Sequence, residues 1–236
     1  MMASVFAQLQ IQDPTSGDSS CVAENGFCPG WIADNFDRYL GPLREHVLLT
    51  VVSVAIGFGI ALVLALMAHR RRWLTGPIIT GTGILYAIPS VAAFFLLQPI
   101  TGLGNTTAVV ALVSYTLLII FRNITDGLRN VPAEMVDAAR GQGLTEGQIL
   151  RQVELPLAVP EIMAGLRIAF STTVGLATLA VFAGGGGLGS EILTDRFFQS
   201  NVVVAGGLAV LLAATFDIIL LGIQRAITPW QRALPS

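Results

Sequence analysis

The sequence predicts an all-α integral membrane protein with five transmembrane helices. Of its 236 residues, 53% are hydrophobic and only 12% are charged, whereas a soluble domain carries about 25% charged residues. Long stretches of the chain contain no charged residue. A helix needs about 20 predominantly apolar residues to cross a hydrocarbon core of roughly 30 Å. The uncharged stretches are long enough to supply five such helices.

The individual spans follow from the points at which charges and turn-forming residues interrupt these apolar stretches. The first span lies between His46 and His69. The uncharged stretch from Trp73 to Phe121 is long enough for two crossings, and the turn-forming sequence Gln98–Asn105 divides it. Two further uncharged stretches predict the last two spans. The predicted spans cover residues 46–68, 76–98, 105–122, 164–184 and 201–222.

The placement of arginine predicts the orientation of the chain. All thirteen basic residues are arginine. If the N-terminus is outside, the inner segments hold ten of them, counting Arg167 near the inner boundary, and the outer segments hold three. The triplet Arg70–Arg72, directly after the first span, contributes most to this difference. Because cytoplasmic loops collect positive charge, the N-terminus is predicted outside and the C-terminus inside.

The segment before the first span is predicted to be an extracytoplasmic arm. Within it, Trp31–Arg44 reads as a short amphipathic helix able to lie in the outer interface. Cys21 and Cys28 form a possible disulfide, since such a bond persists outside the cytoplasm; two unpaired thiols are the alternative. No histidine occurs in the first forty residues, so no metal site is predicted. The expected regions are the arm at 1–45, the transmembrane domain at 46–225 and a cytoplasmic tail at 226–236.

A polar segment of the chain, about residues 130–160, is predicted to lie inside the cell. Pro132 and Glu134 favour a helix start there, and Gly141 and Gly143 permit a break. Thr145 is a plausible N-cap for a second helix that ends at Leu155-Pro156. Two short helices on the cytoplasmic face predict a docking element in preference to an active site.

The same segment resembles the EAA loop of bacterial ABC importer permeases. The family pattern is Glu-Ala-Ala, three residues, Gly, nine residues and Ile-x-Leu-Pro; here Asp137 replaces Glu and Val153 replaces Ile, at matching spacing. The resemblance implies the type I (MetI-like) permease fold. It also implies that the segment is a coupling helix seated in a groove of an ATP-binding subunit. The residues expected to make or shape this contact are Glu134, Asp137, Ala138, Ala139, Gly143, Val153, Leu155 and Pro156.

Further stretches within residues 45–225 are similar to permeases for quaternary-amine osmoprotectants. They are His46–Thr50, Ala87–Ser90, Glu154–Ala158, Ile162–Arg167 and Ala183–Gly189. This resemblance implies an importer of glycine betaine, choline or carnitine in the bacterial cytoplasmic membrane; an amino acid or another cationic solute is the alternative. The implied partners are two ATP-binding subunits, a second permease copy or paralogue, and an extracytoplasmic binding protein.

No catalysis, bound cofactor or nucleic-acid partner is expected of the chain itself. It contains no lysine, and a P-loop requires one against the phosphates. ATP and Mg²⁺ are therefore expected on the partner ATPase. An ion-driven secondary transporter would predict internal repeats and several intramembrane ionisable groups, and an intramembrane enzyme would need a cluster of His, Asp, Glu or Cys. The predicted spans favour neither alternative.

Several residues in the spans are candidates for the transport pathway. Pro89 falls in the middle of a predicted span, where it would bend the helix. Tyr86 and Tyr115 have aromatic faces, which suit quaternary ammonium groups, although packing is the alternative role for each. The pathway candidates are Tyr86, Pro89, Ser90, Tyr115 and Thr172.

Two further features each allow a functional and a structural interpretation. The glycine-rich segment after the fourth span formally fits GxGxxG, but it follows an apolar span where a dinucleotide site requires a strand. It is interpreted as a flexible external hinge that forms a gate or contacts the binding protein, with a plain turn as the alternative; its residues are Gly184, Gly185, Gly186 and Gly187. Asp217, an acid deep within a span, is either functional or paired with Arg122 or Arg225.

Overall fold

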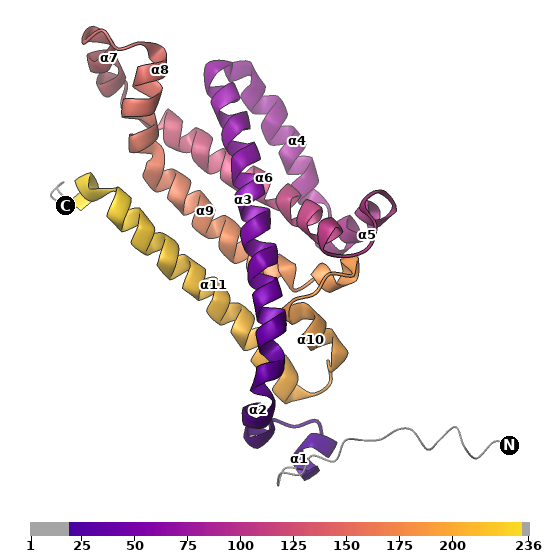
Figure 1. The fold of residues 1–236 in the computed structure, drawn as a ribbon. Coiled ribbons are helices and arrows are strands. Elements are labelled where there is room, and N and C mark those ends of the chain that lie inside the picture. The colour runs from indigo at the N-terminus through magenta and orange to yellow at the C-terminus, as the bar shows by residue number, and fades with distance from the viewer. Residues whose placement is uncertain (1–18, 233–236) are drawn as a thin grey trace.

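The computed structural model describes residues 19–232 of the chain, and every regular element among them is helical (Figure 1). The predicted all-α class is therefore confirmed. The N-terminal arm contains α1 (Ser19–Ala23), α2 (Pro29–Asn35) and a 3₁₀ turn (Phe36–Tyr39). The elements that follow are α3 (Leu40–Arg70), a 3₁₀ turn (Arg72–Leu74), α4 (Thr75–Ala87), α5 (Ser90–Thr101), α6 (Asn105–Arg129), α7 (Ala133–Gly141) and α8 (Glu146–Ile149). The rest are a π-helical turn (Leu150–Glu154), α9 (Leu155–Ala177), a 3₁₀ turn (Ala180–Ala183), α10 (Leu188–Thr194), α11 (Gln199–Ile227) and a 3₁₀ turn (Pro229–Arg232).

Between residues 19 and 232, three helical segments are long and apolar enough to cross a membrane. They are Pro29–Arg70, Asn105–Arg129 and Gln199–Ile227. The pair Arg72–Ala87 and Ser90–Thr101 meets the criterion only when taken together, as one broken span. Helix α9 is not among these candidates; it carries Glu161 and Arg167 within its length. The structure thus gives three candidate spans, or four with the broken pair.

The predicted second span at 76–98 is wrong as a single helix. Helices α4 and α5 meet at an angle of 98°, and the backbone at Ile88 and Pro89 is extended. Proline lacks an N–H and pushes the preceding residue out of the helical region. The hydroxyl of Tyr115, on α6, donates a hydrogen bond to the Ile88 carbonyl. This bond satisfies an acceptor that the break exposes.

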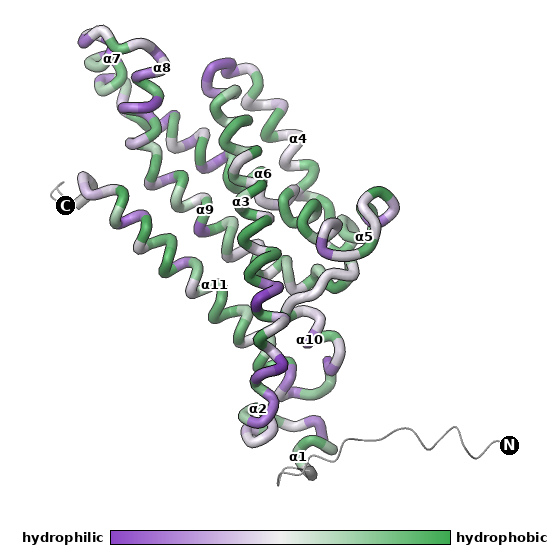
Figure 2. Tube along the Cα trace, in the orientation of Figure 1, coloured by the Kyte–Doolittle hydropathy of each residue, from purple (hydrophilic) through white to green (hydrophobic). Residues whose placement is uncertain are grey.

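The centre of the molecule is formed by α3, α6 and α9, and α11 leans along α9 (Figure 1). Small residues of α3, namely Ala61, Ala65 and Ala68, share a core with Phe121 and Ile124 of α6. Small side chains let the backbones of neighbouring membrane helices approach closely. Figure 2 shows hydrophobic residues along the long helices and most hydrophilic ones towards their ends, with a few within α9 and α11. This pattern is typical of a bundle surrounded by lipid.

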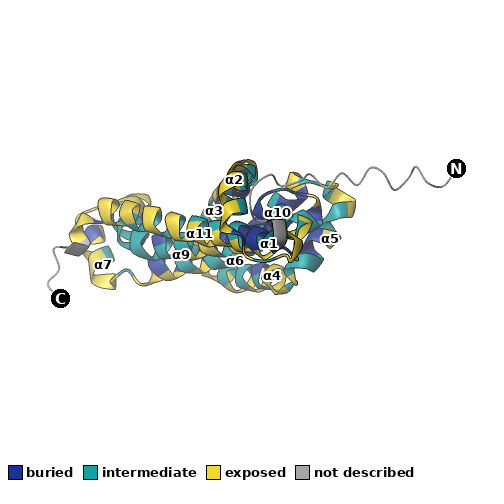
Figure 3. Cartoon of the chain, turned by 90° about the horizontal axis from the view of Figure 1, so that it is seen from below, coloured by how far each residue is buried: buried dark blue, intermediate teal, exposed yellow. Residues whose placement is uncertain are grey.

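The two ends of the bundle carry different elements. Helices α7 and α8 lie at the same end as the C-terminal ends of α3 and α11, whereas α1, α2 and α10 lie at the opposite end (Figure 1). Several arginines lie at the first end. Arg70 ends α3 and Arg71 and Arg72 follow it; Arg129 ends α6, Arg140 lies in α7 and Arg225 lies near the end of α11. Within α10, Leu188 and Gly189 are buried; viewed from the opposite end in Figure 3, much of α11 is exposed. The buried residues of α11 all lie in its N-terminal third, from Ser200 to Ala209.

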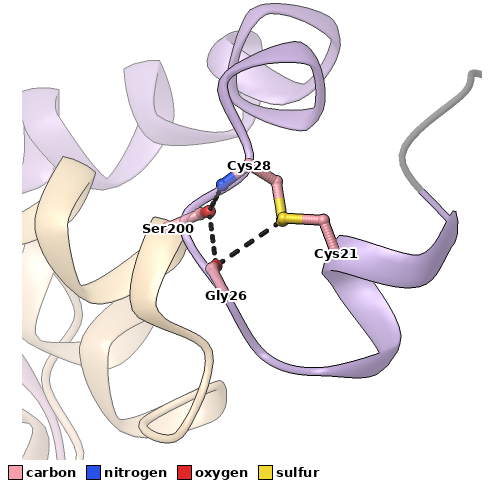
Figure 4. Close-up of a disulfide and its surroundings, with 4 residues drawn as sticks. All are labelled: Cys21, Gly26, Cys28 and Ser200. Carbon is pink, nitrogen blue, oxygen red and sulfur yellow. Dashed lines mark hydrogen bonds between the residues drawn. A yellow bond between two sulfur atoms is a disulfide. The ribbon is translucent and has the colours of Figure 1, made fainter.

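The N-terminal arm packs against the start of α11 (Figure 4). Cys21 and Cys28 form a disulfide in the structure. The Cys28 N–H donates to Ser200 Oγ over 2.7 Å, and that hydroxyl donates to the Gly26 carbonyl over 3.0 Å. Trp31 meets Phe198 edge to face at 4.7 Å between ring centroids. The segment predicted as one amphipathic helix, Trp31–Arg44, is instead divided between α2, a 3₁₀ turn and α3.

Candidate functional site

The EAA-like segment folds into a short helical hairpin, α7 and α8, which we call the coupling hairpin (residues 133–149). The turn between its helices depends on Gly143, whose φ is +84°. Next to it, the Gly143 N–H donates to the Arg140 carbonyl and the Leu144 N–H donates to the Ala139 carbonyl. A left-handed residue after a helix is most often glycine, because it carries no Cβ. The break predicted from the two glycines therefore forms at Gly143, whereas Gly141 is the last residue of α7.

Polar contacts hold the two helices of the coupling hairpin together. Arg140 donates to Asp137 over 2.9 Å and to Glu146 over 3.0 Å, so it links α7 with the start of α8. The hydrogen bond from Arg140 holds the pKa of Glu146 below its usual value. At the start of α8, the N–H of Thr145 donates to Oε1 of Gln148 over 2.8 Å. This bond is one half of a capping box.

The predicted contact residues divide between two faces of the coupling hairpin. Ala139 is buried, together with Ile149 and Leu150. In contrast, Glu134, Asp137 and Ala138 are exposed, and Met135 is half exposed. The small Ala139 thus packs towards the protein, and the neighbouring Ala138 is available to a partner. The surface formed by Glu134, Met135, Asp137 and Ala138 is the outer face of the coupling hairpin.

The end of the motif lies at the start of a long helix. The second helix, predicted to stop at Leu155-Pro156, instead continues through the π-helical turn into α9. Pro156 lies just after the π-helical turn, a distortion of the kind found where proline interrupts the hydrogen bonds of a continuous helix. Val153, Leu155 and Pro156 are half-buried at this junction. They connect the coupling hairpin mechanically to α9 and do not belong to its outer face.

A contact that the sequence analysis missed joins the same junction to α3. Nε2 of His69 lies 3.0 Å from Oε2 of Glu154. The sequence offers a single hint of this contact: Glu154 occupies the variable position x of the Ile-x-Leu-Pro pattern, which any residue can fill. A cavity of about 380 Å³ lies beside this contact, lined by Ala68, His69, Arg72, Arg129, Asp137 and Glu154 among others. The coupling hairpin therefore does not pack flush against the ends of α3 and α6.

The pathway candidates are only partly brought together. Tyr86 and Tyr115 meet edge to face at 5.9 Å between centroids, beside the break at Pro89 and Ser90. Tyr115 is buried and its hydroxyl donates to the Ile88 carbonyl, whereas Tyr86 is 41% exposed. Thr172 lies half-buried on a separate helix, α9. Of the two tyrosines, Tyr86 is the one whose ring is open to its surroundings.

The glycine-rich segment forms a closely packed turn. Gly184 and Gly187 have positive φ angles of 76° and 95°, and a Cβ at Gly186 would overlap the carboxylate of Glu45 on α3. His46, also on α3, is fully buried against this turn. These contacts anchor the turn that was interpreted as a flexible hinge.

The ring of His46 connects three parts of the chain. Its Nε2 lies 3.0 Å from the Val174 carbonyl, which can only accept, and its Nδ1 accepts a bond from the Leu188 N–H over 3.3 Å. This arrangement requires the neutral imidazole with the proton on Nε2. In the sequence, His46 is noticed only as a boundary of the first span and within a stretch of resemblance.

Asp217 is paired, but with a different arginine from those predicted. Arg167 of α9 donates from Nε to Oδ1 of Asp217 over 2.7 Å and from Nη2 to Oδ2 over 2.9 Å. Arg122 and Arg225 were the predicted partners. The reason for the difference is that α9 begins at Leu155 and not at residue 164, which moves Arg167 from the inner boundary to the middle of a helix.

Comparison with known proteins places the chain in a family. Residues 55–233 match the family described as binding-protein-dependent transport system inner membrane component. The choline transport system permease protein OpuBB of Bacillus subtilis (strain 168) is 36% identical over 201 residues, which is 84% of this chain and 93% of that protein. The osmoprotectant import permease protein OsmW of Salmonella typhimurium (strain LT2) is 35% identical over 199 residues, 81% of this chain and 93% of that protein.

Solved structures share the fold. A chain of the MetNI methionine ABC transporter in an inward-facing conformation is 25% identical, with a TM-score of 0.68 over 80% of this chain and 96% of that one. A chain of an amino acid ABC transporter with histidines is 18% identical, with a TM-score of 0.70 over 83% of this chain and 97% of that one. The predicted resemblance to ABC importer permeases is thereby confirmed. The chain belongs to the family of binding-protein-dependent transport system inner membrane components.

Proposed function

We propose that this chain is the permease subunit of an ATP-driven importer of quaternary-amine solutes, such as choline, glycine betaine or carnitine. The observation that carries the proposal is the coupling hairpin. It presents Asp137 and Ala138 on an exposed surface at the arginine-rich end of the bundle. The named relatives with choline and osmoprotectant transport functions support the substrate class.

The arrangement of the helices supports five crossings with the N-terminus outside. In this proposal α3, the broken span formed by α4 and α5, α6, α9 and α11 cross in alternating directions. Beyond the break, α5 turns across the outer end of the bundle. The coupling hairpin and the C-terminal end of α11 then share the cytoplasmic side with most of the arginines, as the positive-inside rule requires. The disulfide-bonded arm falls on the oxidising side, where such bonds persist.

The proposed assembly contains two permeases, two ATP-binding subunits and an external binding protein. ATP and Mg²⁺ bind to the ATP-binding subunits, and this chain catalyses no reaction. Closure of those subunits moves the outer face of the coupling hairpin. The continuous helix through Leu155 and the contact between His69 and Glu154 then pass the movement to α9 and α3. At the outer end, the turn at 184–187 contacts the binding protein or gates the entrance.

An amino acid or other cationic solute is a second candidate substrate. The observation that favours it is the fold shared with methionine and amino acid transporters. Competition separates the two candidates: unlabelled choline or glycine betaine should suppress uptake in this proposal, whereas suppression by amino acids alone would favour the alternative.

Reconstituted complexes test the proposed function. The chain would be co-expressed with its ATP-binding subunit and binding protein, and ATPase activity and solute uptake would be measured in proteoliposomes. Ala138→Glu adds bulk and charge to the outer face and should abolish solute-stimulated ATPase activity. Ala226→Glu, at an exposed position near the end of α11, is the matched control and should retain it. Equal activity of both variants would contradict the proposed role of the coupling hairpin.

A further inference from the structure

The Arg167–Asp217 ion pair lies within the membrane-spanning part of the bundle in the proposed topology. At a rise of about 1.5 Å per residue, Arg167 is roughly 18 Å along α9 from Leu155, and Asp217 is roughly 15 Å along α11 from Ile227. The hydrocarbon core is about 30 Å thick. Gly57, the midpoint of the first span, packs against Thr116 of α6, whereas Gly165 packs against Asn123, closer to the inner end of that helix. Both charges therefore lie in the cytoplasmic half of the core, joined by two hydrogen bonds.

This ion pair is not enclosed by the chain itself. The side chains of Arg167 and Asp217 are 31% and 38% exposed, and only 11% of the apolar window of α11 is buried. A charged side chain within the hydrocarbon core is costly, so such groups face protein or water-filled space. The open side of the pair must therefore face away from lipid, towards a partner or a pathway.

The chemistry around the pair suits a particular class of solute. Phe170 of α9 and Phe216 of α11 stack at 4.8 Å between ring centroids, one turn from Arg167 and adjacent to Asp217 in sequence. Aromatic faces attract quaternary ammonium groups, and a carboxylate adds a full opposite charge. The two bonds to Asp217 use two of the five N–H donors of the Arg167 guanidinium. The others can bind the carboxylate of a zwitterion.

We propose that Arg167, Asp217, Phe170 and Phe216 form a solute contact site on the wall of the translocation pathway, in the cytoplasmic half of the membrane. The inference rests on the proposed importer function and gives it a site. The quaternary ammonium group lies against Asp217 and Phe216, and the carboxylate of glycine betaine or carnitine, where present, binds Arg167. The site is distinct from the aromatic pair Tyr86–Tyr115 at the break between α4 and α5.

Uptake by the reconstituted complex tests this site. Arg167→Leu combined with Asp217→Leu removes both charges and leaves neither partner unpaired. We expect solute uptake to fall at least tenfold, while the ATP-binding subunit still co-purifies in a folded complex. Arg167→Gln alone should impair glycine betaine uptake more than choline uptake, because choline has no carboxylate.

Thiol labelling gives a second measurement that does not depend on transport by the double variant. Phe216→Cys should react with a trimethylammonium methanethiosulfonate, and glycine betaine should slow the reaction. Phe121→Cys, in the fully buried core of α6, is the control and should not react. Wild-type uptake by the double leucine variant, or no labelling at position 216, would overturn the site and leave the importer function standing. Failure of the wild-type complex to import any solute would instead refute the importer function.

Discussion

Gly143 shows how the conformation of one residue shapes the proposed coupling element. Its φ of +84° places it in the left-handed region, where a residue with a Cβ costs roughly 1–2 kcal/mol. The turn between α7 and α8 depends on this conformation, and so does the direction in which the outer face points. The glycine was recognised in the sequence because the motif requires it there; its backbone angle explains why.

Replacing this glycine by alanine should therefore impair coupling without adding bulk to the outer face. We expect Gly143→Ala to lower solute-stimulated ATPase activity and uptake several-fold, because the hairpin spends less time in the required geometry. Gly141→Ala is the control, since Gly141 is helical and a Cβ there would meet nothing within 4 Å. Both activities would be measured in proteoliposomes. Equal losses in the two variants would argue against a role for the left-handed turn.

Individual residues were predicted well where a local rule determines them, and poorly where a distant partner does. Asp217 was recognised as a candidate for an ion pair because an acid in an apolar span needs a partner. Its partner, Arg167, depends on how α9 and α11 lie against each other, and no local pattern reports that. The same reason explains why the role of His46, between α9 and the glycine-rich turn, was missed.

At the scale of elements, the break between α4 and α5 tests how a membrane helix tolerates a sharp bend. The Tyr115 hydroxyl donates to the Ile88 carbonyl at the break, and a net hydrogen bond contributes about 0.5–1.5 kcal/mol. Tyr115→Phe should lower the thermal stability of the detergent-purified chain by a few degrees. Tyr86→Phe, which keeps the ring contact with Tyr115, is the control and should have little effect. A Tyr115→Phe protein as stable as wild type would show that the bend does not depend on this bond.

The arm gives a second prediction at this scale. In the chain-entropy description, closing the eight-residue loop between Cys21 and Cys28 stabilises the ordered arm by about 2–3 kcal/mol. Reduction of the wild-type protein, or the change Cys21→Ser with Cys28→Ser, should therefore speed limited proteolysis of the arm. The double serine variant should not respond to reductant, which serves as the control. If proteolysis stays slow after reduction, the contacts of Arg38 with Glu191 and Asp195 are sufficient to hold the arm.

Among the elements, apolar length predicted the helices of the first, third and fifth spans but not the second and fourth. Hydropathy reports only how long and how apolar a stretch is. It could not show that α4 and α5 meet at 98° beside Pro89. It also placed the start of the fourth span at residue 164, after Glu161. In the structure the helix continues through Glu161 back to Leu155, since packing against α6 replaces a purely lipid environment.

For the whole molecule, the different features of its two ends support one fixed orientation in the membrane. The arginine-rich loops and the coupling hairpin lie at one end, and the disulfide-bonded arm lies at the other. In a background of Cys21→Ser and Cys28→Ser, an impermeant maleimide added to intact cells should label Phe27→Cys. It should label Ala226→Cys only after the membrane is permeabilised. Both positions are exposed in the structure, so labelling of position 226 in intact cells would reverse the proposed orientation.

The measurement that tests the central claim most directly is a site-specific photo-crosslink from the coupling hairpin. A benzophenone side chain would replace Ala138 on its outer face, with the same group at Ala226 as the control, in membranes that contain the co-expressed ATP-binding subunit. Our account predicts a crosslink to that subunit from position 138 and little or none from position 226. The claim that this hairpin receives the movement of the ATPase would be contradicted by no crosslink from position 138 in an assembled, ATP-hydrolysing complex.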